Sequence, residues 1–192
     1  MKCLYCHHED IFQPNEILCP CCQQPLLFDS IQFNTANFTS DGEIALQTYR
    51  QFLPLTGINP ELSLKEGATP LLRLFSLEKF LNKAGILAKL ENANPTLSFK
   101  DRGTAVVVQK LAEMKIKKIG TVSTGNMASS TAAYAARCGL EAFLLVKRGT
   151  SVGALISSAA FEPVIIEVDG DYGQLFYKSY ELGKKYDIYF AN

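Results

Sequence analysis

Short apolar runs alternate with helix-length segments over the second half of the sequence, and this alternation limits the fold more than any other feature. Apolar runs that have the length of buried strands lie at 86–91, 118–123, 142–147 and 163–168. Segments that have helical spacing lie at 101–115, 126–139, 152–161 and 171–186, and another strand begins at 187. Strands that alternate with helices predict βαβ units and a parallel sheet covered on both faces. The sequence therefore predicts an α/β fold.

The composition excludes several classes of partner. Lysine plus arginine equals aspartate plus glutamate at 19 each among the 192 residues, and 47% of the residues are hydrophobic. Balanced charge provides no basic surface for nucleic acid and no block of like charge for a membrane surface. No apolar run approaches the ~20 residues of a transmembrane helix, and the N-terminus turns polar too early for a secretory signal. We expect a cytoplasmic protein without nucleic-acid or membrane partners.

The N-terminal segment is rich in cysteine. It contains two Cys-x-x-Cys pairs, Cys3 with Cys6 and Cys19 with Cys22. Four thiolates suit tetrahedral zinc, although the interval between the pairs is a little short for a zinc ribbon. Possible substitute ligands are Cys21, His7 and His8. The sequence predicts a zinc-ribbon-like segment with a possible structural zinc, and the alternative is a segment that folds without metal.

The segment NPTLSFKDRG gives Lys100 unusual neighbours. Ser98 and Asp101 match the capping-box pattern, which places the lysine in the first turn of the helix that follows. The helix N-terminus, the charge of Arg102 and burial behind Phe99 would all favour the neutral amine. Schiff-base chemistry needs that neutral form. The alternative is a surface lysine at a capped helix start.

A second segment, STGN, follows the strand at 118–123 and begins a helix. Gly125 lets the backbone approach a ligand closely. Ser123, Thr124 and Asn126 add side-chain donors beside the free N–H groups of the helix start, which favours an anion. The alternative is an ordinary helix cap.

NPTLSFKDRG and STGN, about twenty residues apart, together resemble the fold-type II pyridoxal-phosphate enzymes, which have the tryptophan synthase β-like fold. Within that group SFKDRG most resembles the threonine synthase family, and EGATPL at 66–71 is similar to the EGxTPL of that family. A cysteine-rich segment ahead of such a core also occurs in many threonine-synthase-like members. The resemblance runs along the whole chain.

The resemblance implies roles toward pyridoxal phosphate for five residues. Lys100 would form a Schiff base with the cofactor and later move protons at the substrate carbons. Phe99 would pack near the cofactor ring, and Asn126 would hydrogen-bond its 3-hydroxyl group. Asp101 and Arg102 would orient the helix start from behind.

The resemblance also implies a substrate site. Ser123, Thr124 and the backbone at Gly125 would hold the α-carboxylate of an amino-acid phosphate. For a threonine synthase this substrate is O-phosphohomoserine, which reacts with water to give threonine and phosphate. Candidate ligands for the substrate phosphate, none favoured by spacing, are Arg102, Lys89 and Arg148.

Other functions stay open at this point. The lysine motif is shared with other fold-type II enzymes, such as cysteine synthase-like enzymes of β-replacement and serine or threonine dehydratases. A rival of another class is a non-catalytic remnant, or a zinc-ribbon module that uses the α/β part to bind a ligand.

The chain departs from the family pattern in two ways. Leu97 stands where the family usually has glycine, and the chain looks like the N-terminal half of a longer enzyme. The expected regions are a zinc-ribbon-like segment, an N-terminal segment and linker, the start of a larger cofactor domain and a smaller parallel α/β domain, at 1–28, 29–70, 71–117 and 118–192. We expect uncovered apolar faces around residues 71–75 and 86–90, which favour self-association and a possible homo-oligomer.

Overall fold

The computed structural model describes residues 1–11, 13, 16, 18–27 and 42–192. The polar stretch at 33–43 and the first part of the 29–70 region therefore lie almost wholly outside the described residues.

Residues 118–192 form a four-stranded parallel sheet in the order β7-β6-β5-β8. The strands are β5 (Lys118–Val122), β6 (Glu141–Lys147), β7 (Val164–Val168) and β8 (Tyr189–Phe190). Each begins within two residues of a predicted run, because each run has apolar residues on both faces and is bounded by a turn. The predicted α/β fold with a parallel sheet is confirmed.

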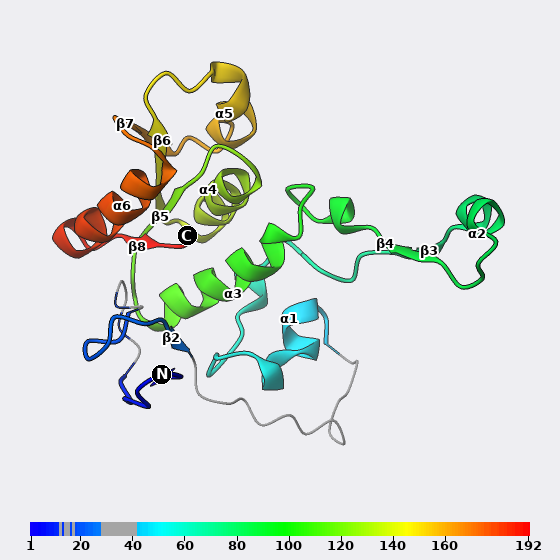
Figure 1. The fold of residues 1–192 in the computed structure, drawn as a ribbon, viewed down its shortest axis with the longest axis horizontal. Coiled ribbons are helices and arrows are strands. Elements are labelled where there is room, and N and C mark those ends of the chain that lie inside the picture. The colour runs from blue at the N-terminus through cyan, green and yellow to red at the C-terminus, as the bar shows by residue number, and fades with distance from the viewer. Residues whose placement is uncertain (12, 14–15, 17, 28–41) are drawn as a thin grey trace.

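Helices cover both faces of this sheet (Figure 1). They are α4 (Asn126–Cys138), α5 (Val152–Ala159) and α6 (Tyr172–Tyr186). Side chains alternate along each strand, so Leu144 of β6 packs with Ala128 of α4, whereas Leu145 packs with Leu175 of α6. The sheet is thus a central layer between α4 and α5 on one face and α6 on the other.

The helix that carries Lys100, α3 (Lys100–Glu113), lies against α4 beside the sheet. Val108 and Leu111 share a buried core with Ile119 of β5 and Tyr134 of α4. The chain turns back after α3 and enters β5 at residue 118, so the start of α3 and the carboxyl end of β5 lie at the same end of the molecule.

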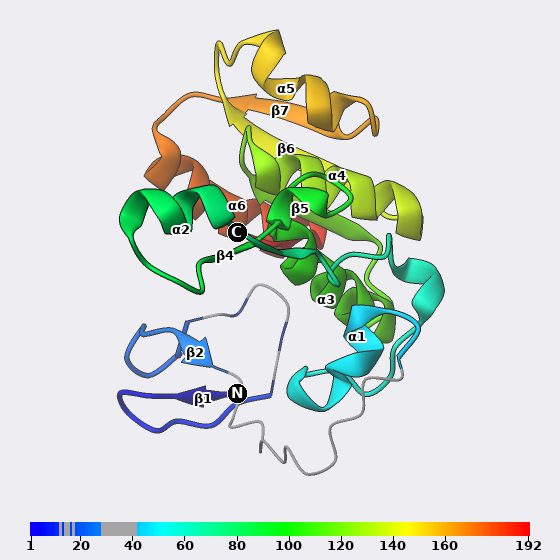
Figure 2. The same ribbon diagram turned by 90° about the vertical axis from the view of Figure 1, so that its right-hand side faces the viewer.

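An arm extends from this body in Figure 1, and it points toward the viewer, in front of the body, in Figure 2. It consists of β3 (Leu71–Arg73), α2 (Phe75–Leu81) and β4 (Leu87–Lys89), with β3 and β4 antiparallel. The strand β4 lies in the apolar run predicted at 86–91. The sequence KEGATPLLRL at 65–74 predicts a turn followed by an extended segment, which contains β3, whereas α2 was not predicted. No residue of these three elements is buried. The expected uncovered apolar faces are present, since Leu71 is 58% exposed, Phe75 68% and Leu87 53%.

The described residues of the N-terminal part form short elements. They are β1 (Lys2–Cys3), antiparallel to β2 (Leu26–Leu27), and then α1 (Ala45–Thr48) with 3-10 turns at Arg50–Phe52 and Pro60–Leu62. A further 3-10 turn, Glu91–Ala93, follows β4. The sequence IALQTYRQFLP at 44–54 predicts a helix that Pro54 ends. The segment is instead a single α turn followed by a 3-10 turn, and Leu53, before Pro54, is already extended. Among the described residues, no helix has the length and apolar character that a membrane span needs.

Candidate functional site

Lys100 is the first residue of α3, as predicted. Its amine lies 4.8 Å from the centroid of the Phe99 ring. Phe99 is itself 57% exposed and Lys100 is half-buried, so the ring lies beside the amine without enclosing it. In this arrangement the ring face attracts the charged ammonium.

The hydrogen bonds of Ser98 and Asp101 also differ from those of the expected capping box. The Ser98 hydroxyl accepts a hydrogen bond from the backbone N–H of Lys100 at 3.2 Å. Asp101 is fully buried and instead accepts two bonds from Thr96, 2.7 Å from its backbone nitrogen and 2.6 Å from its hydroxyl. A buried carboxylate with two donors holds the preceding loop rigidly against the helix start.

Arg102 points to the other side of α3. Its guanidinium donates to both carboxylate oxygens of Glu91 at 2.8 Å and to the Thr69 hydroxyl at 3.1 Å. These hydrogen bonds from Arg102 lower the pKa of Glu91 to about 2, against the opposing effect of burial. The positive charge expected beside Lys100 is thus neutralised by Glu91, and Arg102 fixes α3 to the base of the arm.

The EGATPL segment is joined to the lysine segment by buried polar groups. The Glu66 carboxylate accepts from Ser63, from the Leu64 backbone and, at 2.6 Å, from the Tyr134 hydroxyl of α4. Burial, reinforced by Glu66, raises the pKa of Tyr134. The Gly67 N–H donates to Asn94 at 3.0 Å. Sequence reasoning missed this network, because its partners are up to 68 residues apart along the chain.

The STGN segment forms the turn from β5 into α4, which begins at Asn126. The Ser123 hydroxyl accepts from the Gly125 N–H at 3.2 Å. The first N–H groups of α4 have no partner within the helix and point out of its start. A Cβ atom at Gly125 would meet no heavy atom within 4 Å, so the space above this backbone is open.

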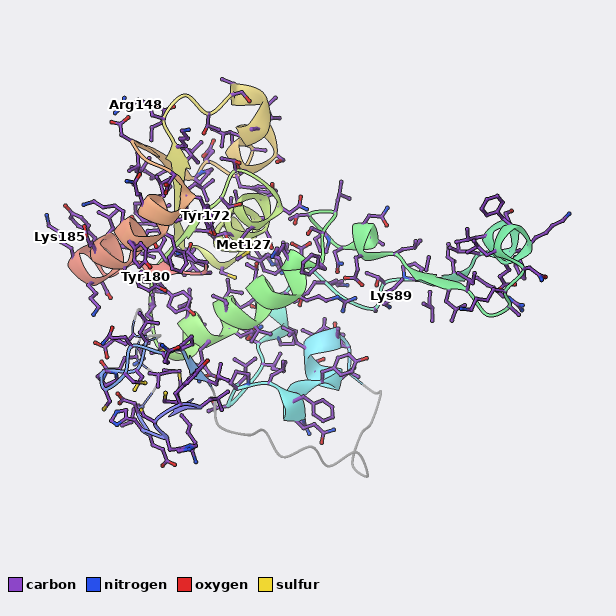
Figure 3. The ribbon with its side chains drawn as sticks, viewed as in Figure 1. Lys89, Met127, Arg148, Tyr172, Tyr180 and Lys185 are labelled. Carbon is purple, nitrogen blue, oxygen red and sulfur yellow. The ribbon has the colours of Figure 1, made fainter. Side chains whose placement is uncertain are left out.

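Lys100 and the STGN segment line one cavity of about 560 Å³. The predicted residues that it brings together are Lys100, Ser123, Thr124, Gly125 and Asn126, with Thr121, Val122, Met127, Tyr172 and Asn192 completing the wall. Figure 3 labels Met127 and Tyr172, which come from α4 and α6. A second cavity of about 460 Å³, on the α6 side of α3, adjoins Lys100 and includes Phe99 and Arg102.

Two of the candidate phosphate ligands lie outside both cavities. Lys89 is on β4 of the arm and donates to the Thr69 carbonyl. Arg148 follows β6 and pairs with Asp169 at 2.6 Å. Figure 3 shows both at a distance from Met127 and Tyr172. The structure therefore does not bring Lys89 or Arg148 to the Lys100 cavity.

Leu97 has a left-handed backbone, with φ of 61°, and its side chain is 72% exposed. Glycine adopts this conformation without the steric cost that a side chain imposes. Leucine in place of glycine therefore strains the backbone of the loop before Lys100. Its exposed side chain adds no core packing.

The N-terminal cysteines also come together. The Sγ atoms of Cys3, Cys6, Cys19 and Cys22 lie within 4.8 Å of one another. Cys3 and Cys22 are 3.5 Å apart, and Cys6 and Cys19 3.4 Å. A tetrahedral zinc with Zn–S bonds of ~2.3 Å needs sulfurs separated by roughly 3.8 Å. The donor set thus fits a metal, and Cys21 stays outside it.

A comparison with protein families matches residues 62–192 to the family described as "Pyridoxal-phosphate dependent enzyme". The chain belongs to this family. The threonine synthase of Methanocaldococcus jannaschii is 37% identical over 151 residues, which are 78% of this chain and 37% of that protein. The threonine synthase of Halalkalibacterium halodurans is 40% identical over 130 residues, 66% of this chain and 36% of that protein.

Solved structures of the same fold give a wider range of names. The O-acetyl serine sulfhydrylase isoform 3 of Entamoeba histolytica superposes with a TM-score of 0.62 at 24% identity, over 72% of this chain and 45% of that chain. The threonine deaminase isoform 2 of Solanum lycopersicum superposes with a TM-score of 0.60 at 20% identity, over 66% of this chain and 35% of that chain. These structures confirm the fold. The chain spans little more than a third of the length of the curated relatives it matches.

The residues around the 560 Å³ cavity fit a pyridoxal phosphate group. An aldehyde needs an amine, which Lys100 supplies, and anionic groups need N–H donors, which the start of α4 supplies. The open space above Gly125 leaves room for a flat ring close to the backbone.

Proposed function

We propose that Lys100 carries pyridoxal phosphate and that the chain is part of a lyase of the threonine synthase type. The observation that carries the proposal is the shared cavity, which is lined by Lys100 at the start of α3 and by the turn that begins α4. The names of the curated relatives support the reaction type.

Pyridoxal phosphate, when bound, withdraws electrons from the carbons of an attached amino acid. The chain's own residues would bind and orient the cofactor and the amino acid. The Lys100 amine would hold the group and would take up and return protons at the substrate carbons. Asn126, which lines the same cavity at the start of α4, would hold a hydroxyl of the ring.

The substrate proposed is O-phosphohomoserine, with threonine and phosphate as products. Ser123, Thr124 and the N–H groups at the start of α4 bind its α-carboxylate, because a helix start favours an anion. Asp101 and Arg102 support the site indirectly. They fix the loop and the first turn of α3, which limits the directions from which the lysine can approach the cofactor.

The lysine assignment is tested by attachment. After incubation with pyridoxal phosphate and reduction with borohydride, peptide mass spectrometry should find the added mass on Lys100. Lys100→Ala should lose this signal, whereas Lys110→Ala, on the same helix but outside the cavity, should keep it. Undiminished attachment elsewhere in Lys100→Ala would show the assignment to be wrong.

The reaction is tested by its products. Because the chain spans 37% of the Methanocaldococcus relative, we expect the 192 residues alone to bind the cofactor weakly and to show no turnover. A chain lengthened to match these relatives should release phosphate from O-phosphohomoserine. Release of keto acid from serine or threonine instead would favour a dehydratase, the function named for one structural neighbour.

We also propose a structural zinc on Cys3, Cys6, Cys19 and Cys22. The four Sγ atoms lie within 4.8 Å of one another, which is the compact arrangement that a four-thiolate metal site requires. Metal analysis should find one zinc per chain. Cys19→Ser should lose it, and Cys21→Ser should keep it. Four reduced thiols without metal in the gently purified protein would reject the proposal.

A further inference from the structure

Thr121 carries a buried hydroxyl group that makes no hydrogen bond with any described residue. The residue is 1% exposed, and its Oγ1 atom has no hydrogen-bond partner among the described residues. The oxygen is closed off from solvent, so bulk water does not replace the missing partner. Thr121 lines the same cavity as Lys100.

The strand geometry places this side chain on the Lys100 side of the sheet. Residues two apart on a strand share a face. Ile119 packs in the core with Val108 and Leu111 of α3, so Thr121 faces the same layer, one step nearer the carboxyl end of β5. That end of β5 lies beside the start of α3, where Lys100 is.

Lys100 also lacks a hydrogen-bond partner for its amine. Among the described residues, the contact recorded for Nζ is the Phe99 ring. The amine is therefore not paired with an acceptor, and the residue that carries the unpaired hydroxyl group lines the same cavity.

Two other buried hydroxyl groups, one on α3 and one on α4, are paired with each other. The Thr104 hydroxyl donates to the Lys100 carbonyl at 3.1 Å and accepts from Ser130 at 2.8 Å. Thr131 of α4 shares the unpaired state of Thr121 but does not line the cavity. A valine would fill the volume of Thr121 without burying an unpaired polar group. Packing alone therefore does not account for a threonine at this position.

We propose that Thr121 is a positioning residue for Lys100. When the lysine side chain leaves the Phe99 ring and turns into the cavity, its nitrogen hydrogen-bonds with the Thr121 hydroxyl. A hydroxyl oxygen accepts from either form of the amine, and its proton can be donated to the neutral form. The bond directs the nitrogen toward the cavity where the aldehyde binds. This inference rests on the proposed role of Lys100 as the cofactor-bearing residue.

The experiment compares Thr121→Val with Thr131→Val, a matched control that removes the other unpaired buried hydroxyl. Each protein is incubated with pyridoxal phosphate from pH 6 to 10 and reduced with borohydride, and labelling of Lys100 is measured against that of the other lysines. Thr121→Val should reduce Lys100 labelling about five-fold and change its pH profile. Thr121→Ser should restore both, and Thr131→Val should leave both unchanged.

Thermal unfolding without cofactor separates positioning from structure. Both valine variants should unfold at the wild-type temperature or about 2–4 °C higher, because each removes an unsatisfied buried hydroxyl. Equal Lys100 labelling in wild type and Thr121→Val would overturn the inference and leave the proposed function intact. Absence of Lys100 labelling in the wild type would instead overturn the proposed function.

Discussion

The sheet of residues 118–192 and the arm of residues 71–89 are made from similar apolar sequences, yet only the first has a core. Leu144 and Leu145 of β6 are fully buried between helices, whereas Leu71, Leu72 and Leu87 of the arm are each about half exposed. The sheet strands have neighbours and helices from nearby in the chain. The arm has two paired strands and one helix, which cannot bury an apolar face by themselves. The comparison shows that an apolar pattern specifies a strand but not what covers it.

The largest effect should come from truncating a sheet side chain. Leu145→Ala removes a fully buried side chain that packs against Leu175, so we expect a loss of roughly 2–5 kcal/mol in the free energy of unfolding. Leu87→Ala, a matched truncation in the arm, should change it by no more than about 0.5 kcal/mol. Urea denaturation monitored by circular dichroism measures both. Equal losses would contradict the division between a packed body and an uncovered arm.

An intermediate effect is expected at the joint between the two regions. Glu91 follows β4, and its ion pair with Arg102 anchors the arm to α3. Because Arg102 lowers the pKa of Glu91 from its ordinary 4.5 to about 2, the pair stabilises the folded state above pH 4.5, and this stabilisation is lost as the pH falls toward 2. Since both groups are about a third exposed, the contribution is at most about 1 kcal/mol.

Glu91→Gln tests this linkage. The variant should be less stable than wild type at pH 6, and the difference in unfolding free energy should shrink as the pH falls from 4.5 toward 2. Glu141→Gln is the control, because Glu141 is exposed and has no ion pair among the described residues. A Glu91→Gln difference that is constant with pH would refute the assignment of the pair as the pH-dependent anchor.

The sequence predicted the sheet well because its signals are local. Apolar runs, turns and helical spacing recur along 118–192, and the STGN segment lies at a strand end that the pattern itself locates. The helix α2 was missed because none of its residues is buried, so no buried stripe marks it. The contacts of Arg102 with Glu91 and of Glu66 with Tyr134 depend on segments that meet only in the folded chain. Thr121 looks like any strand residue until the cavity beside it is known.

The smallest effect on stability should accompany a clear effect on association. Phe80, at 84% exposure, is among the most exposed large apolar residues of the arm. Phe80→Lys should leave the free energy of unfolding within about 0.5 kcal/mol of wild type. It should nevertheless reduce self-association in sedimentation velocity, because it places a charge among the exposed apolar side chains of the arm, through which we expect copies to associate. Ile156→Lys, which alters an apolar residue of α5 that is 64% exposed, is the matched control on the body and should leave association unchanged. If Ile156→Lys reduces self-association and Phe80→Lys does not, the surface through which copies associate belongs to the sheet domain. The exposed apolar side chains of the arm would then not cause association.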